Sequence, residues 1–295
     1  MKKWVAILGL VSVLPGFVFA GGKAQGGSGG TGTVPTEITV ISREDGSGTR
    51  GAFIELFKIE ERDASGKRVD KTTKEAVISN RTDIMLSAVA GNPSAIGYVS
   101  LGSLNATVKA VNIDGTAASI ANVENGSYKI SRPFNIAVKG NAGGTGTSAA
   151  QDFISFILSR EGQEVVAKGY IPVVANAPAY TGSSSGRVVL AGSSSVTPVM
   201  EQLREAYLAR NPQAVIEIQM SDSSTGIKAA IDGTCDIGMA SRELSDTEKA
   251  QLTPTVIAID GIAVIINPGN PLSGLSSAQV KQVFTGEITS WQALN

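Results

Sequence analysis

Residues 38–57 read ITVISREDGSGTRGAFIELF, and this stretch decides how the chain is interpreted. Its first four residues are β-branched, as in a buried strand, and the residues from 51 onward carry apolar side chains at helical spacing. Between them lies a polar loop with arginine, carboxylates, glycines and hydroxyls. A strand that ends in such a loop and continues into a helix is the repeating unit of an α/β fold.

The same succession recurs along the chain. Short β-branched runs predict strands at 38–42, 95–100, 109–113, 134–140, 188–193, 215–221, 236–241 and 255–267. Apolar periodicity predicts helices at 49–59, 82–91, 149–169, 197–212, 225–233 and 276–286. Helix starts and stops agree with this: Pro198, capping boxes Ser245 with Glu248 and Ser276 with Gln279, and Gly233 and Gly286. We therefore expect an α/β fold with mixed or parallel sheets.

The first twenty residues predict export. Lys2 and Lys3 precede an apolar run that ends in small residues, so we expect a signal peptide at 1–20 that is cleaved after Ala20. A membrane anchor is the alternative, but Pro15 interrupts the run and the glycine-rich segment 21–35 resembles a flexible linker. The predicted location is periplasmic.

Charge and residue content exclude several classes of function. The chain has 25 basic and 26 acidic residues, so loss of Lys2 and Lys3 leaves 23 against 26, a net charge near −3. This balance argues against a nucleic-acid partner. With no histidine, and Cys235 in a context typical of a small core residue, we expect no catalytic residues, no metal site and no cofactor.

Three further loops resemble the first one. AGSSSVTP (191–198), SDSSTGIK (221–228) and GMASREL (238–244) each place small hydroxyl residues directly after a predicted strand, and the first two continue into helices. Unpaired N–H groups and a partial positive charge make a helix start suitable for binding anions. Taken singly, each loop is more often only a helix cap or a turn. Four of them together predict a site for a small oxyanion.

Arg43 and Asp45 add charge to this predicted site. The guanidinium of Arg43 offers a planar fork of donors that matches two oxygens of phosphate or sulfate. Asp45 can orient Arg43 and can accept a hydrogen bond from a protonated oxyanion, which phosphate provides at neutral pH and sulfate does not. Nucleotide-binding glycine motifs do not appear in the required context, so a small inorganic anion is favoured.

These segments resemble the phosphate-binding proteins of bacterial high-affinity phosphate ABC transporters. The matching stretches cover nearly the whole chain after the signal: 38–50, 92–102, 130–140, 188–203, 221–244, 260–271 and 283–291. The resemblance implies a two-lobe periplasmic binding protein fold of type II, with two crossover strands and the ligand in the cleft between the lobes. It implies these anion contacts: Arg43, Asp45, Ser47, Gly48, Thr49, Ser194, Ser195, Ser223 and Ser241.

Two departures from the family pattern stand out. Some members carry an aspartate where this chain has Ser241, which leaves the acceptor for phosphate's proton to Asp45 or to a residue elsewhere. The loops also occur in a different order, which predicts a circular permutation with the linker 175–186 joining the family's two termini. Segments 38–42 and 290–295 should then lie together. The alternative is that the sequence is a piece of a longer tandem protein.

The permuted order predicts one lobe from 36–130 plus 267–295 and a contiguous lobe from 131–266. The resemblance implies a monomeric, non-enzymatic protein that binds inorganic phosphate in the periplasm and delivers it to the permease subunits of an ABC transporter. Two alternatives stay open: a binder of another tetrahedral oxyanion such as sulfate, or a sensor or adhesin that retains the fold.

Overall fold

The computed structural model describes residues 36–64, 68–140 and 148–294. The predicted signal peptide 1–20 and the linker 21–35 lie outside these residues. The strands are β1 (Thr39–Arg43), β2 (Glu60–Arg62), β3 (Arg68–Asp70), β4 (Val77–Ser79), β5 (Ala95–Ser100), β6 (Lys109–Ala110), β7 (Asn112–Ile113), β8 (Ser131–Lys139), β9 (Arg187–Ser193), β10 (Val215–Ser221), β11 (Ile237–Ala240), β12 (Leu252–Ile266) and β13 (Gly274–Leu275).

The helices alternate with these strands. They are α1 (Gly48–Leu56), α2 (Thr82–Gly91), α3 (Ile120–Glu124), α4 (Ser148–Leu158), α5 (Arg160–Val166), α6 (Thr197–Leu208), α7 (Ser223–Asp232), α8 (Asp246–Lys249) and α9 (Ser277–Thr285), with short 3-10 turns η1 (Leu101–Ser103) and η2 (Trp291–Leu294). None of the helices that the structure describes has the length and apolar character needed to cross a bilayer.

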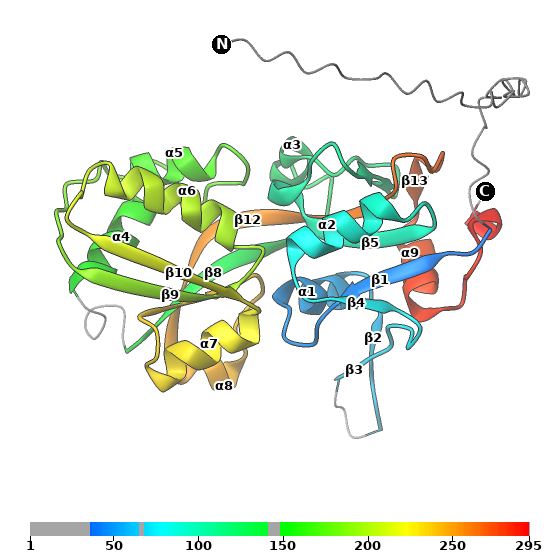
Figure 1. Ribbon diagram of the computed structural model, residues 1–295, viewed down its shortest axis with the longest axis horizontal. Helices are drawn as coiled ribbons and strands as arrows, with labels where there is room; N and C mark the ends of the chain where they lie inside the picture. Colours follow the sequence, from blue (N-terminus) through cyan, green and yellow to red (C-terminus); the bar gives the residue numbers. More distant parts are fainter. Residues whose placement is uncertain (1–35, 65–67, 141–147, 295) are drawn as a thin grey trace, which may run out of the picture. The chain divides into compact units, whose positions relative to one another are not determined.

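One mixed sheet organises the described chain, with strand order β10-β9-β11-β8-β12-β5-β1-β4 and β6 paired to β12 (Figure 1). We call β4, β1 and β5 the β1 half, and β10, β9, β11 and β8 the β9 half. Pairing is parallel within β10-β9-β11 and within β5-β1-β4. The polar loops that follow these parallel strands lie at the carboxyl ends of the strands, where ligands bind in such sheets.

β12 belongs to both halves. Residues Leu252–Gly261 pair antiparallel with β8, and residues Ile262–Ile266 pair antiparallel with β5. A buried ion pair joins the two long strands where they meet the β1 half, since Arg132 on β8 donates to Asp260 on β12 at 3.2 Å. β8 and β12 are therefore the two crossover strands that the family resemblance implies.

Separate apolar clusters stabilise the two halves. In the β9 half, α4, α5 and α6 cover one face of the sheet around Phe153, Phe156 and Tyr207, and α7 covers the other face with Ile227. In the β1 half, α1 and α9 pack around Phe53, and α2 packs on the opposite face. The boundaries of the two lobes stay a prediction.

Most predicted elements are confirmed to within a few residues. The helix predicted at 149–169 is interrupted at Ser159, whose hydroxyl caps the new helix α5 by accepting from Gly162 N at 3.2 Å. The strand predicted at 109–113 is divided into β6 and β7. Strands β2, β3 and β4 were not predicted, because each has three residues and the first two consist largely of charged side chains.

Segments distant in sequence meet as expected. Ile38 N donates to Thr289 O at 2.8 Å and Trp291 N donates to Thr36 O at 2.9 Å, so the start of β1 and the segment from 290 lie together. The linker 175–186 contains no helix or strand, but Tyr180 fixes it by donating to Asp152 at 2.5 Å. Cys235 is buried as predicted, and burial raises the pKa of its thiol to about 11.

Candidate functional site

The first wall of the site is the loop that joins β1 to α1. Ser47 is the N-cap of α1, and its hydroxyl accepts from Arg50 N at 3.3 Å. Gly48 and Thr49 are the first two residues of the helix, and both are buried. An N-cap hydroxyl satisfies only part of the first helical turn, so backbone N–H groups of this turn remain available as donors. We call residues 43–49 the Arg43 wall.

Arg43 lies at the carboxyl end of β1 and is 2% exposed. Its Nε and Nη2 donate to the two carboxylate oxygens of Glu44 at 2.8 and 2.7 Å. The other edge of the guanidinium faces away from Glu44, where Nη2 donates to Ser194 Oγ at 3.0 Å and Nη1 to Thr82 Oγ1 at 3.3 Å. One edge is therefore fixed by a carboxylate and the other points at hydroxyl groups.

The prediction that Asp45 orients Arg43 is wrong. The Asp45 side chain is 98% exposed and accepts from Arg50 Nη1 at 2.7 Å. The loop turns at residues 45 and 46, so Glu44 follows the buried guanidinium while Asp45 points to solvent. A carboxylate in this position cannot accept a hydrogen bond from a protonated anion that is held between buried hydroxyls.

The second wall is formed by three loops of the β9 half. We call Ser193–Ser195, Ser223 and Ser241 the serine wall; all are buried. Ser193 Oγ donates to Ser241 Oγ at 3.0 Å, and Ser241 N donates to Ser223 Oγ at 3.1 Å. Asp222 caps α7 by accepting from Thr225 N at 2.9 Å, which places Ser223 at the first helical position. The loops after β9, β10 and β11 thus converge on one point.

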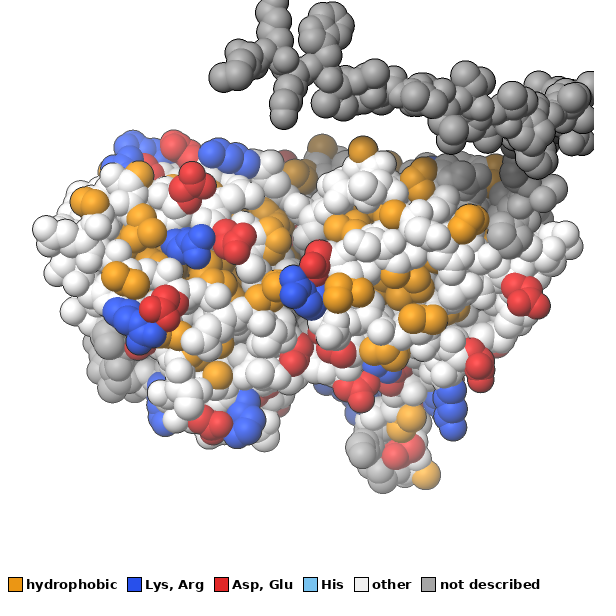
Figure 2. Space-filling view, in the orientation of Figure 1, with side chains coloured by type: hydrophobic (Ala, Val, Ile, Leu, Met, Phe, Trp, Pro, Cys, Tyr) orange, Lys and Arg blue, Asp and Glu red, His pale blue; other side chains and the backbone are white. Residues whose placement is uncertain are grey.

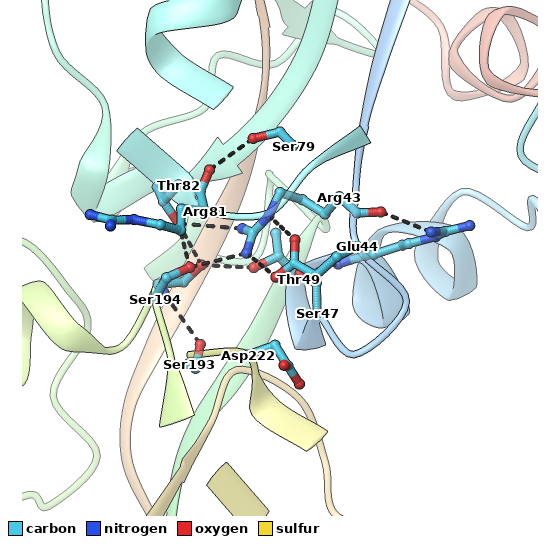
Figure 3. A network of polar contacts seen from close by, with 12 residues as sticks. Arg43, Glu44, Ser47, Thr49, Ser79, Arg81, Thr82, Ser193, Ser194 and Asp222 are labelled. Carbon is cyan, nitrogen blue, oxygen red and sulfur yellow. Dashed lines mark hydrogen bonds and ion pairs between the residues drawn. The ribbon is translucent and has the colours of Figure 1, made fainter. Parts of the chain in front are cut away.

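The two walls are in direct contact (Figure 3). Arg43 bonds to Ser194 across the site, and Thr49 Oγ1 shares a hydrogen bond of 2.8 Å with Ser195 Oγ. Gly48 fits tightly against the serine wall, because a Cβ atom there would lie 2.4 Å from Ser223 Oγ and 2.8 Å from Ser241 Oγ. The structure therefore brings together all predicted site residues except Asp45, with Ser47 serving as the cap of α1.

Sequence reasoning missed three members of this cluster: Ser193, which stands next to the predicted Ser194, Glu44 and Thr82. Glu44 stands beside Asp45 in the same loop, and only the direction of the turn distinguishes them. Thr82 is the first residue of α2, and its hydroxyl approaches Arg43, Ser194 and Ser195. The pattern of strand, loop and helix could have indicated Thr82, but the preceding strand β4 is too short to be recognised.

The electrostatics of the cluster favour a small anion. Helices α1, α2, α6 and α7 all begin at it, and each helix start carries partial positive charge. Tyr98 supports the Arg43 wall from β5, since its hydroxyl accepts from Arg43 N at 3.1 Å. Burial raises the pKa of Tyr98, so its hydroxyl stays neutral. The arrangement can surround an oxyanion with hydroxyl, amide and guanidinium donors.

A cleft of about 610 Å³ borders this cluster. Gly51 and Ala52 of α1 line one side, and Arg242 and Glu248 line the other. Figure 2 shows a notch in the surface between the parts over α7 and α8 and over β2 and β3. The cleft adjoins the cluster through Arg242, whose Cγ would lie 3.1 Å from a Cβ atom at Gly48, but the predicted anion-contact residues do not line it. Among the described residues, no group of three or more Cys, Asp and Glu side chains could hold a metal.

Comparison with known proteins defines the class. A family model described as a PBP superfamily domain matches residues 19–161 and 177–295. A two-part sheet with crossover strands and a buried cluster of hydroxyl, amide and guanidinium donors between the parts agrees with that class of binding protein. The chain belongs to the PBP superfamily.

Individual relatives define the family within that class. The chain is 52% identical over 298 residues to phosphate-binding protein PstS 2 of Streptococcus agalactiae, covering 100% of this chain and 98% of that protein. It is 48% identical over 259 residues to phosphate-binding protein PstS 2 of Streptococcus pneumoniae, covering 87% of each. The chain is therefore a member of the phosphate-binding protein family.

A solved structure supports the same assignment. The phosphate-binding protein of a phosphate ABC transporter from Streptococcus pneumoniae matches with a TM-score of 0.69 and 47% identity, covering 88% of this chain and 100% of that one. The alignment with the Streptococcus agalactiae relative runs through the whole chain in one order. The two proteins therefore share their segment order, and the circular permutation relative to other family members stays a prediction.

Proposed function

We propose that this protein binds inorganic phosphate between the Arg43 wall and the serine wall and delivers it to the permease subunits of an ABC transporter. The observation that carries the proposal is the convergence of one buried arginine and buried hydroxyls from both halves of the sheet on one point. Relatives that cover the chain at 48–52% identity are named phosphate-binding proteins, which supports the same ligand.

The proposed ligand set follows from the contacts. We assign direct anion contacts to Arg43, Ser47, Gly48, Thr49, Ser194, Ser195, Ser223 and Ser241. Asp45 is withdrawn from the set, because its carboxylate lies in solvent against Arg50. In this assignment Glu44, rather than Asp45, orients the guanidinium of Arg43. Binding would be a hinge closure of the two predicted lobes, 36–130 plus 267–295 and 131–266, about β8 and β12.

A second candidate is a binder of another tetrahedral oxyanion such as sulfate. The observation that favours it is that neither of the two expected positions offers a carboxylate to the hydroxyl cluster: Ser241 offers a hydroxyl, and Asp45 points outward. A hydroxyl can either donate or accept, so it discriminates weakly between a protonated and an unprotonated oxyanion. We prefer phosphate because the relatives that cover the chain are named phosphate-binding proteins.

Location and partners follow from the proposed transport role. Export through the predicted signal peptide 1–20 would place the site outside the cytoplasmic membrane, where a permease can receive the anion. We assign no enzymatic activity, since the chain has no histidine and the site offers donors without an evident general base. A monomer is sufficient, because both walls come from one chain.

Calorimetric titration tests the proposal. Phosphate is titrated into the mature protein, and sulfate is titrated in parallel and as a competitor. Saturable phosphate binding with weak sulfate binding is expected. Absence of phosphate binding would contradict the proposed function, and equal affinity for both anions would favour the second candidate.

A further inference from the structure

Thr82 has contacts unlike those of any residue that the sequence pointed to. It is the first residue of α2, it is 5% exposed, and its hydroxyl approaches members of both walls. Thr82 Oγ1 lies 3.3 Å from Arg43 Nη1, 3.3 Å from Ser194 Oγ and 3.2 Å from Ser195 Oγ. Figure 3 shows its side chain directed at the guanidinium edge that faces Ser194.

These distances are long for hydroxyl contacts. Hydrogen bonds between hydroxyl groups are commonly near 2.7–2.8 Å, whereas all three contacts of Thr82 exceed 3.1 Å. A hydroxyl has a single proton and can donate to only one acceptor. An anion oxygen in this position could accept from Thr82, Ser194 and Arg43 at once, which neutral hydroxyl groups cannot do for one another.

The start of α2 is also open to a ligand. Arg81 is its N-cap and makes no side-chain cap hydrogen bond, because its guanidinium turns outward to Asp83 at 2.9 and 3.0 Å. The first N–H groups of a helix have no partner within it. Thr82 therefore stands in front of uncapped donors, and its buried hydroxyl is directed at the arginine of the site.

We infer that Thr82 is a further anion-binding residue, which contributes a hydroxyl from α2 to the oxyanion held by Arg43 and Ser194. This inference rests on the proposed function. It adds a third element of the β1 half to the site, besides β1 and α1. Because Thr82 also contacts Ser195, its hydroxyl helps to hold the Arg43 wall and the serine wall together.

The hydroxyl of Thr82 can be removed with little change in packing. Met85, Leu86 and Val89 anchor α2 in the core, and within the described residues the Thr82 hydroxyl contacts Arg43, Ser194 and Ser195 of the site. Valine has the same branched shape as threonine, so Thr82→Val removes the hydrogen bond and keeps the volume. Thr82→Ser keeps the hydroxyl. Thr285→Val is the matched control, because Thr285 donates to Gln282 O at the end of α9.

Phosphate affinity of the four proteins is measured by calorimetry, together with the Tm with and without phosphate. Loss of a hydrogen bond to a charged ligand should weaken binding about 10- to 100-fold in Thr82→Val. We expect Thr82→Ser to stay within about threefold of the unaltered protein, since the donor is retained. Thr285→Val should bind normally. The Tm without phosphate should not change in Thr82→Val, whereas the rise in Tm on adding phosphate should shrink.

The outcomes separate the inference from the proposed function. If the unaltered protein binds phosphate and Thr82→Val binds it equally well, the inference is wrong and the proposed function stands. If the unaltered protein does not bind phosphate, the proposed function itself fails. If Thr82→Val does not fold, Thr82→Ala replaces it, and normal affinity in that variant would overturn the inference.

Discussion

Arg43 and Arg132 are both buried, at 2% and 3% exposure, but they have opposite kinds of surroundings. Each nitrogen of the Arg43 guanidinium has a partner, and on one edge these partners are the hydroxyls of Thr82 and Ser194. Arg132 bonds to Asp260 through Nη2 alone, and within the described chain its Nε and Nη1 have no hydrogen-bond partner. Arg43 therefore combines a carboxylate on one edge with hydroxyls from both halves of the sheet on the other, whereas Arg132 has the carboxylate of Asp260 alone.

Position in the sheet explains the difference. Arg43 ends β1 between the two walls, whereas Arg132 and Asp260 lie opposite each other on β8 and β12, away from the loops. Burial lowers the pKa of Arg132, and the carboxylate of Asp260 opposes that shift. Asp260 also accepts from Ser100 Oγ at 2.9 Å. One buried cation thus lies in the proposed anion site, and the other holds the strands that connect the halves.

The largest effect on stability should come from breaking the buried ion pair of Arg132 and Asp260. Arg132→Met leaves Asp260 buried without its cation, which should lower the free energy of unfolding by about 3–5 kcal/mol. Denaturant unfolding measures this loss. The double variant Arg132→Met with Asp260→Leu should recover most of it, because it removes both charges. A single variant as stable as the unaltered protein would show that water already reaches this pair.

Arg43→Met should weaken ligand binding and leave stability almost unchanged. It removes the positive charge that donates to Ser194 of the serine wall, and phosphate binding should weaken by about 2–5 kcal/mol. The free energy of unfolding without phosphate should change little, because Glu44 is 19% exposed and can be hydrated. Calorimetry and denaturant unfolding on the same samples give both numbers. Unchanged affinity would place the anion elsewhere.

Gly48→Ala tests whether phosphate binding at Arg43 requires close contact between the Arg43 wall and the serine wall. The added methyl group would meet Ser223 Oγ at 2.4 Å, so closure should weaken and phosphate affinity should fall by about 1–3 kcal/mol. Gly51→Ala is the control, because its nearest neighbour would be Arg242 Cδ at 3.9 Å. Equal affinities of the two variants, measured by calorimetry, would mean that the walls do not need this contact.

The smallest effect is expected from one hydroxyl of the serine wall. Ser223→Ala removes one neutral donor among several, so phosphate affinity should fall by about 1–2 kcal/mol, less than for Arg43→Met. Ser221→Ala is the control, because Ser221 Oγ donates to Asp222 O outside the cluster. The comparison would be overturned if Ser223→Ala weakened calorimetric binding as much as Arg43→Met.

The sequence predicted the positions of the loops because strand and helix periodicity are local properties. It could not choose between Glu44 and Asp45, since the direction of adjacent side chains depends on backbone angles within the turn. Thr82 was missed because a three-residue strand gives too little pattern. The pair Arg132 and Asp260 spans 128 positions, and nothing local to either residue indicates the other.

β12 couples the halves of the sheet in a way that binding alone does not reveal. Its residues Leu252–Gly261 complete the pairing of β8, and Ile262–Ile266 complete that of β5, within one uninterrupted strand. If β12 detaches from its partner in one half, we expect the other half to lose the same central strand. In the proposed mechanism the protein closes as two bodies over its ligand, and we expect it nevertheless to unfold as a single cooperative unit.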